Sequence, residues 1–135
     1  MIGLDLSNVD LRWRDLGCGN LEEANLYGAL LEETILYKSN LENANLESAL
    51  LFKADLSEAN LKKAILKKAN LFEAYMYKTN LSGANLSRAY MLGADLSEAN
   101  LENVVLEKAK YDSKTIWPKD FDPQKHGAIL IEDED

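Results

Sequence analysis

The sequence is poor in cysteine, histidine and proline, and it contains no long apolar run. Cys18 is the single cysteine, so no disulfide can form within the chain and a reducing cytoplasm is the expected location. The opening MIGLDLSNVD lacks a basic stretch followed by an apolar one, and no apolar run approaches the ~20 residues of a membrane span. We therefore expect neither export nor contact with a membrane.

Residues that carry catalysis or bind metals are equally scarce. His126 is the only histidine, and neither a nucleophile nor a metal-ligand spacing accompanies it. No base lies near Cys18 in the sequence to activate its thiol. The sequence thus predicts a protein that is not an enzyme, with no catalytic residue, no metal site and no cofactor.

Charge is plentiful but unevenly distributed. The net charge is −8, yet residues 51–111 contain 9 bases and 7 acids. The one cluster of bases there is too short for the continuous basic stripe that neutralises nucleic-acid phosphates, so we interpret it as a solvated face and predict no direct nucleic-acid binding. The cluster consists of Lys62, Lys63, Lys67 and Lys68.

What the chain has in abundance is leucine at every fifth position. From Leu6 to Leu106, 19 of 21 such positions are leucine and the other two are methionine. Two residues earlier, from Ala24 to Ala109, alanine fills 14 of 18 positions. Steps of five rotate by about 140° around a helix, and an odd period sends successive side chains to opposite faces of a strand. The period therefore predicts a chain that turns a corner once per repeat, with Ala and Leu pointing inward.

Surface residues indicate how many repeats make one coil. If four repeats close a coil, residues 20 apart stack, and five asparagines beginning at Asn20 form one column. A three-repeat coil would instead stack Asn20 on Ile35, so the four-sided coil is favoured. In this register Asp15, Asp55 and Asp95 share a column at two-coil intervals of about 10 Å, too far apart to share one ion. We expect these carboxylates to bind turn backbone instead.

The repeated motif A(D/N)Lxx, as in ADLSEANLKKA and SGANLSRAYMLGADLSEANLENV, resembles that of the pentapeptide-repeat family. The resemblance covers roughly residues 4 to 111, and TIWPKDFDP is similar to the tails that follow the repeats in cyanobacterial-type bacterial members. It implies an all-β fold, a right-handed quadrilateral parallel β-helix of about five coils of 20 residues with a short C-terminal cap.

We therefore divide the chain into a β-helix at residues 1–111 and a C-terminal capping segment with an acidic tail at residues 112–135. Arg14 and Gly19 stand where alanine is the rule, and burying an unpaired arginine would cost several kcal/mol, so the first coil is expected to be irregular or open to solvent. The period stops after Tyr111, and the apolar end of the last coil needs a cover. The expected covering residues are Ile116, Trp117 and Phe121.

Large apolar side chains gather on two adjoining outward faces of the expected coil. They can stabilise coil stacking, as cross-strand pairs do, or form a surface for a partner protein or for self-association. We name these ten residues the apolar face. It comprises Leu30, Leu50, Phe52, Phe72, Tyr90, Leu92, Ile35, Tyr37, Tyr75 and Tyr77.

Two functions follow as hypotheses. The first is a non-enzymatic scaffold or protein–protein interaction module that contacts an unidentified protein, either as a monomer or as an end-to-end or face-mediated dimer. The alternative, implied by the family resemblance, is a DNA mimic that inhibits or protects DNA gyrase, as in quinolone resistance. The net positive charge of residues 51–111 weighs against mimicry, and five coils span only about 25 Å, some seven base pairs.

Overall fold

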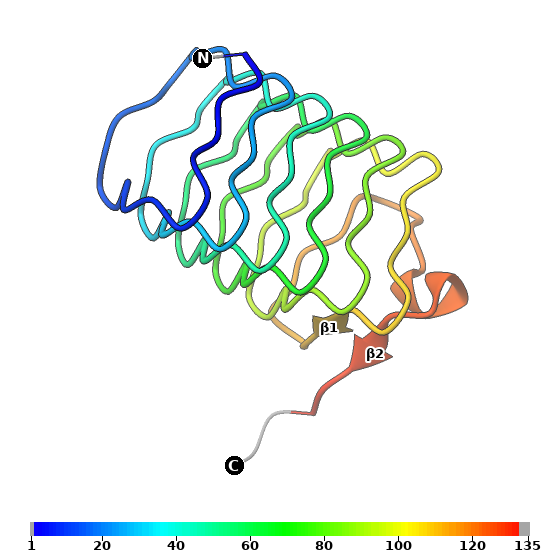
Figure 1. The fold of residues 1–135 in the computed structure, drawn as a ribbon. Helices are drawn as coiled ribbons and strands as arrows, with labels where there is room; N and C mark the ends of the chain where they lie inside the picture. Colours follow the sequence, from blue (N-terminus) through cyan, green and yellow to red (C-terminus); the bar gives the residue numbers. More distant parts are fainter. Residues whose placement is uncertain (1, 133–135) are drawn as a thin grey trace.

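The computed structural model describes residues 2–132, which wind into a stack of four-sided coils (Figure 1). Successive coils pair in parallel through single residues 20 apart, as where Asn40 bridges to Asn60. Two-residue strands occur within residues 2–132 only at β1 (Lys110–Tyr111) and β2 (Ile129–Leu130), which pair in parallel with each other. The predicted right-handed quadrilateral β-helix with a 20-residue coil is therefore confirmed.

Each regular repeat satisfies all five of its backbone N–H groups, which explains the motif. In the repeat from Asn60 to Ala64, the N–H of Asn60 donates to the preceding coil at 2.9 Å, and those of Leu61 and Lys63 donate to the next coil at 2.8 and 2.9 Å. The N–H of Ala64 donates to the carbonyl of Leu61 at 3.0 Å and closes the corner. The N–H of Lys62 donates to the side-chain Oδ1 of Asn60 at 3.1 Å. Asn or Asp before the leucine thus completes the hydrogen bonding of the corner.

The second residue of the corner has a left-handed backbone throughout the stack. Its φ ranges from 54° at Lys53 to 63° at Trp13 among the non-glycine corners of the coils, and Gly83 has a φ of 67° at the same position. An L-residue in this conformation costs about 1–2 kcal/mol. The N–H of the same residue bonds to the next coil, as at Lys63, and this bond offsets the cost.

The alanines and leucines of the repeat point inward as predicted. Leu61 and Ala64 have no exposed surface, and Met76 takes a leucine position without exposure. Thr79 replaces an alanine, and its hydroxyl donates to the carbonyl of Leu56 at 2.7 Å. The core is therefore a continuous apolar stack in which this buried hydroxyl has its partner.

The first coil is open to solvent at its outer end. Arg14 is exposed, and Leu6 and Leu11 are only partly buried where they pack against the core. The backbone of this coil is nevertheless regular, because Asp15 bridges to Ile35 in the same 20-residue register. The expectation of an irregular first coil is thus wrong for the backbone. Arg14 avoids burial because no coil stacks above it in the described chain.

The repeat continues for one more side after β1, with one residue inserted. Asp95 bridges to Ile116, 21 residues away, so Thr115, Ile116 and Trp117 take the Ala, Asn and Leu positions. Ile116 consequently points outward and is 51% exposed, which corrects its assignment to the cap. Trp117 and Phe121 pack against the core as the cap requires.

The chain after Phe121 returns to the last coil. The 3-10 helix η1 (Pro123–His126) begins where the carboxylate of Asp122 accepts from the N–H of Gln124, and it ends at Gly127, whose φ is 87°. β2 then pairs with β1 and brings Ile129 beside the coil edge (Figure 1). No helix within residues 2–132 has the length and apolar character to cross a bilayer.

Candidate functional site

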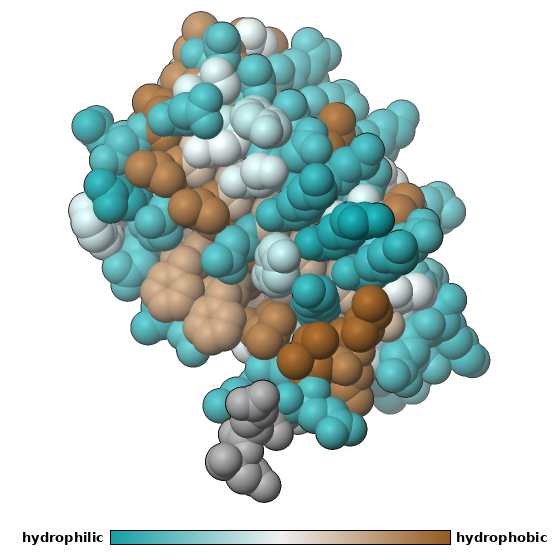
Figure 2. Space-filling model, turned by 60° about the horizontal axis from the view of Figure 1, so that its bottom comes forward, coloured by the Kyte–Doolittle hydropathy of each residue, from teal (hydrophilic) through white to brown (hydrophobic). Residues whose placement is uncertain are grey.

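The apolar face separates into an exposed set and a half-buried set. Figure 2 shows apolar side chains, tan and brown, running along this side of the molecule beside hydrophilic ones. Six of the ten residues are between 37% and 52% exposed, with Tyr75 the most exposed. The exposed members are Ile35, Tyr37, Leu50, Tyr75, Tyr77 and Tyr90, and the half-buried ones are Leu30, Phe52, Phe72 and Leu92.

The half-buried aromatic residues stack across neighbouring coils. The ring centroids of Phe52 and Phe72 lie 5.5 Å apart, with planes at 7°. Such a pair is the contact that the coil-stacking interpretation requires. The exposed residues of the set show no ring pair of this kind within the described chain. The coil-stacking interpretation therefore accounts for Phe52 and Phe72, and no ring stacking among residues 2–132 accounts for the exposed members.

Five members of the apolar face occupy the position that Asn or Asp holds in a regular repeat. They lack the amide or carboxylate Oδ1 that accepts from the corner N–H, whereas Asn40 and Asp55 accept from the N–H two residues later at 3.1 and 3.0 Å. The apolar side chains are thus not explained by the needs of the corner. The five residues are Leu30, Ile35, Leu50, Tyr75 and Tyr90.

Lysines flank the aromatic rings of the apolar face. Lys38, Lys53 and Lys78 each place Nζ 5.2 to 5.3 Å from the ring of the preceding residue. Lys110 Nζ lies 5.2 Å from the ring of Tyr90, its neighbour in the preceding coil. These are cation–π distances. Glutamates lie among the same lysines, since Glu58 Oε2 accepts from the hydroxyl of Tyr37 at 3.1 Å and the carboxylate of Glu73 lies 3.6 Å from Lys53 Nζ.

The predicted aspartate column consists of separate side chains that bind backbone. Ile35 and Tyr75 lie between its members, and Asp95 Oδ1 accepts from the N–H of Ser97 at 2.9 Å. The expected bond to turn backbone is therefore confirmed. Within residues 2–132 no group of three or more His, Cys, Asp or Glu side chains is placed to hold a metal ion. Cys18 is exposed, and the ring of His126 stacks on Phe121 with centroids 4.7 Å apart.

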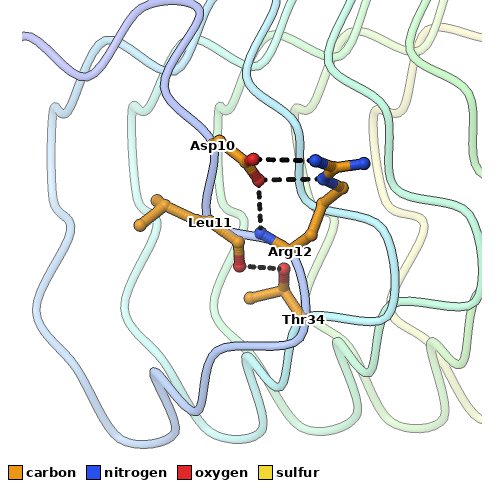
Figure 3. Close-up of polar contacts among 4 residues, drawn as sticks. All are labelled: Asp10, Leu11, Arg12 and Thr34. Carbon is orange, nitrogen blue, oxygen red and sulfur yellow. Dashed lines mark hydrogen bonds and ion pairs between the residues drawn. The ribbon is translucent and has the colours of Figure 1, made fainter.

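Near the open end, Asp10 and Arg12 form a two-point ion pair. Arg12 Nε donates to Asp10 Oδ1 at 2.9 Å and Nη2 donates to Oδ2 at 2.8 Å (Figure 3). These hydrogen bonds lower the pKa of Asp10 to about 2. Beside them the hydroxyl of Thr34 donates to the carbonyl of Leu11 at 2.8 Å and ties the second coil to the first.

Sequence reasoning missed a basic groove at another corner. It has a volume of about 450 Å³ and is lined by four cationic side chains together with Tyr90 and Ile129. The signal is present in the sequence, since three of the cations lie at intervals of 20 residues, whereas the predicted basic cluster groups lysines that are close along the chain. The cations are Lys68, Arg88, Lys108 and Lys110.

Comparison with known proteins identifies the repeat. The family model for pentapeptide repeats matches with eight copies, at residues 5–43, 20–51, 31–67, 39–76 and 69–107 among others. No curated protein matches the chain.

Three solved structures illustrate the likeness. The pentapeptide repeat protein Rfr23 from the cyanobacterium Cyanothece 51142 is 33% identical, with a TM-score of 0.72 over 86% of this chain and 89% of its own. The pentapeptide repeat protein alr5209 from Nostoc PCC 7120 is 31% identical, with a TM-score of 0.54 over 94% and 84%. The plasmid-mediated fluoroquinolone resistance protein QnrB1 is 19% identical, with a TM-score of 0.56 over 94% and 64%.

Proposed function

Because the chain belongs to the pentapeptide-repeat family, we propose that it is a non-enzymatic scaffold whose apolar face binds a partner protein. The observation that carries the proposal is the exposure of six large apolar side chains on adjoining sides of the coil, four of them tyrosines, together with the replacement of Asn or Asp at five positions of this face. Each replacement forgoes a corner hydrogen bond worth about 0.5–1.5 kcal/mol. Large apolar side chains that are costly to the fold and still exposed are typical of interaction surfaces.

The structure of the face suggests the character of the partner. Tyr75, Tyr77 and Tyr90 are exposed aromatic side chains on a rigid lattice, so little conformational entropy would be lost when they dock. Charges of both signs lie beside the rings, since Lys78 Nζ is 5.3 Å from the ring of Tyr77 and Glu58 accepts from the hydroxyl of Tyr37. We therefore propose a partner with an apolar centre and a rim that carries charges of both signs. The cytoplasm is the proposed location, because the chain has one cysteine.

Binding to DNA gyrase is not proposed as the function. The 19% identity to QnrB1 supports a shared fold alone. The excess of bases over acids in residues 51–111 also opposes mimicry of a duplex. A supercoiling assay with purified gyrase, with and without quinolone, should show no effect of this protein.

The proposal is tested by removing exposed aromatic residues from the face. Tyr75→Ser with Tyr77→Ser is the test variant, and Ile65→Ser with Val105→Ser is its matched control, because Ile65 and Val105 are 38% and 43% exposed on another side of the coil. Each protein would be immobilised and used to capture proteins from cells of the organism that encodes it. A partner retained by the wild type and the control but lost by the test variant is the expected result.

Two outcomes would contradict the proposal. The first is equal capture by the test variant and the control at equal melting temperatures. The second is concentration-dependent self-association in sedimentation that the test variant abolishes, because a second copy would then occupy the apolar face.

A further inference from the structure

Three cations stack at one corner of the β-helix without an acid between them. Lys68, Arg88 and Lys108 each occupy the second corner position, with φ of 59°, 61° and 59°. The N–H of Lys68 donates to the carbonyl of Ser87 at 3.1 Å, and that of Arg88 donates to the carbonyl of Glu107 at 3.0 Å. These bonds hold successive corners at the coil spacing of about 4.8 Å. The fold thus places three like charges in a line about 10 Å long.

Other corners of the same stack alternate or pair their charges. At one of them Lys53 Nζ lies 3.6 Å from the carboxylate of Glu73 in the next coil. The ion pairs within residues 2–132 are this one and Arg12–Asp10, so none of the groove cations is paired there. Like charges opposite one another across a ladder are destabilising. The line of cations is therefore not explained by coil stacking.

The cations line a groove with an apolar side. Its volume of about 450 Å³ is within the range of small-molecule sites, and Lys110 is its fourth cation. The ring of Tyr90, 44% exposed, and the side chain of Ile129 from β2 form the apolar part. The groove thus joins a corner of the β-helix to the capping segment.

We propose that this groove binds a small ligand with two or more linked phosphate groups. Arg88 matches a phosphate with paired donors, and the three lysines supply point charges around it. Four cations in one small volume call for a multiply charged anion rather than a single carboxylate. The chain as a whole carries a charge of −8, which repels a long polyanion and favours a compact one. The groove shares Tyr90 and Lys110 with the edge of the apolar face, but the Tyr75–Tyr77 variant that tests the apolar face alters neither residue, so the two proposals can fail separately.

Isothermal titration at fixed ionic strength with inorganic pyrophosphate, and separately with ATP, tests the proposal. Saturable binding at one site is expected. Arg88→Gln with Lys108→Gln should weaken it by about tenfold or more, since each charge-assisted bond contributes substantially. The matched control is Lys62→Gln with Lys63→Gln, which removes two lysines from a corner groove of about 270 Å³ that contains Glu102. This control should change the affinity by less than about twofold.

The results separate the sources of binding. If ATP binds more strongly than pyrophosphate and Tyr90→Ala abolishes this difference, the apolar part of the groove binds the nucleoside. If the two ligands bind equally, the phosphates alone are recognised. Both results support the site. The groove variant should melt at or above the temperature of the wild type, because a like-charge contact is removed. No saturable binding, or an equal loss in both lysine variants, overturns the proposal. Tighter binding of a short single-stranded oligonucleotide than of ATP also overturns it.

Discussion

The rings of Phe52 and Phe72 lie nearly parallel, 5.5 Å apart, one coil after the other. Their partial burial places them in the part of the apolar face that stabilises the stack. The tyrosines of the apolar face, in contrast, are between 37% and 52% exposed.

We expect Phe52→Ser and Phe72→Ser to be energetically coupled. A double-mutant cycle by thermal or urea unfolding should give a coupling of about 0.5–1.5 kcal/mol, and the double variant should melt several degrees lower. Tyr37→Ser with Tyr77→Ser is the control, because these residues are two coils apart and their effects should add. Additivity in the phenylalanine cycle would contradict a stabilising role for the stack.

Glycine should be favourable at the second corner position and unfavourable at the first. Lys63 has a φ of 58°, so Lys63→Gly removes the cost of a left-handed side chain and should raise the free energy of unfolding by up to about 1 kcal/mol. Lys62→Gly, at the neighbouring exposed position, should lower it because glycine gains entropy in the unfolded chain. Equal effects of the two substitutions in urea unfolding would exclude this account of the corner.

Trp117 should carry most of the stability of the cap. It packs on Tyr111 and Phe121 with ring centroids 5.4 Å away in each case. Trp117→Gln should cost about 3 kcal/mol or more and reduce solubility, because the end of the core becomes exposed. Ile116→Gln, one residue earlier but 51% exposed, should change the stability by less than about 0.5 kcal/mol. Thermal melts and light scattering of the two variants measure the difference.

Asp10 should titrate at about 2 in the folded protein rather than at its ordinary value of 3.8. A lowered folded-state pKa contributes stability above pH 3.8, and that contribution is lost as the pH falls toward 2. Carboxyl-carbon NMR follows this titration directly. Arg12→Ala should move the midpoint back toward 3.8, because it removes the two hydrogen bonds that favour the carboxylate. An unchanged midpoint would show that the ion pair does not form in solution.

The coil, its four sides and its inward residues could be predicted because the sequence repeats every five residues and its surface residues match every 20. Leu61 has to point inward wherever the chain turns once every five residues. The left-handed backbone of Lys63 could not be predicted, since Lys and Glu stand at this position more often than Asn or Gly, and of these only Asn and Gly favour a positive φ. It is imposed by the hydrogen bonds to the next coil.

The candidate sites could be predicted only where their residues recur at the 20-residue spacing of the coil. The apolar face was located by stacking residues 20 apart, but its division into stacked and exposed members depends on side-chain packing. One residue inserted after Tyr111 shifts the register by one position and turns Ile116 outward, so its assignment to the cap was wrong. The basic groove includes Ile129, which lies outside the repeats and reaches Tyr90 only through the pairing of β1 with β2.

Because the coils are regular, the length of the stack can change without a change in the fold. Because each coil binds its neighbours through the same backbone bonds, excision of 20 consecutive residues would rejoin matching corners and shorten the stack by about 4.8 Å. Every column of residues 20 apart would lose one residue, and the others would keep the same outward or inward orientation. Loss of the coil that contains Phe72 would thus place Phe52 next to Leu92 and leave the first coil and the cap unchanged. Surface composition can change in such steps by recombination while the fold is preserved.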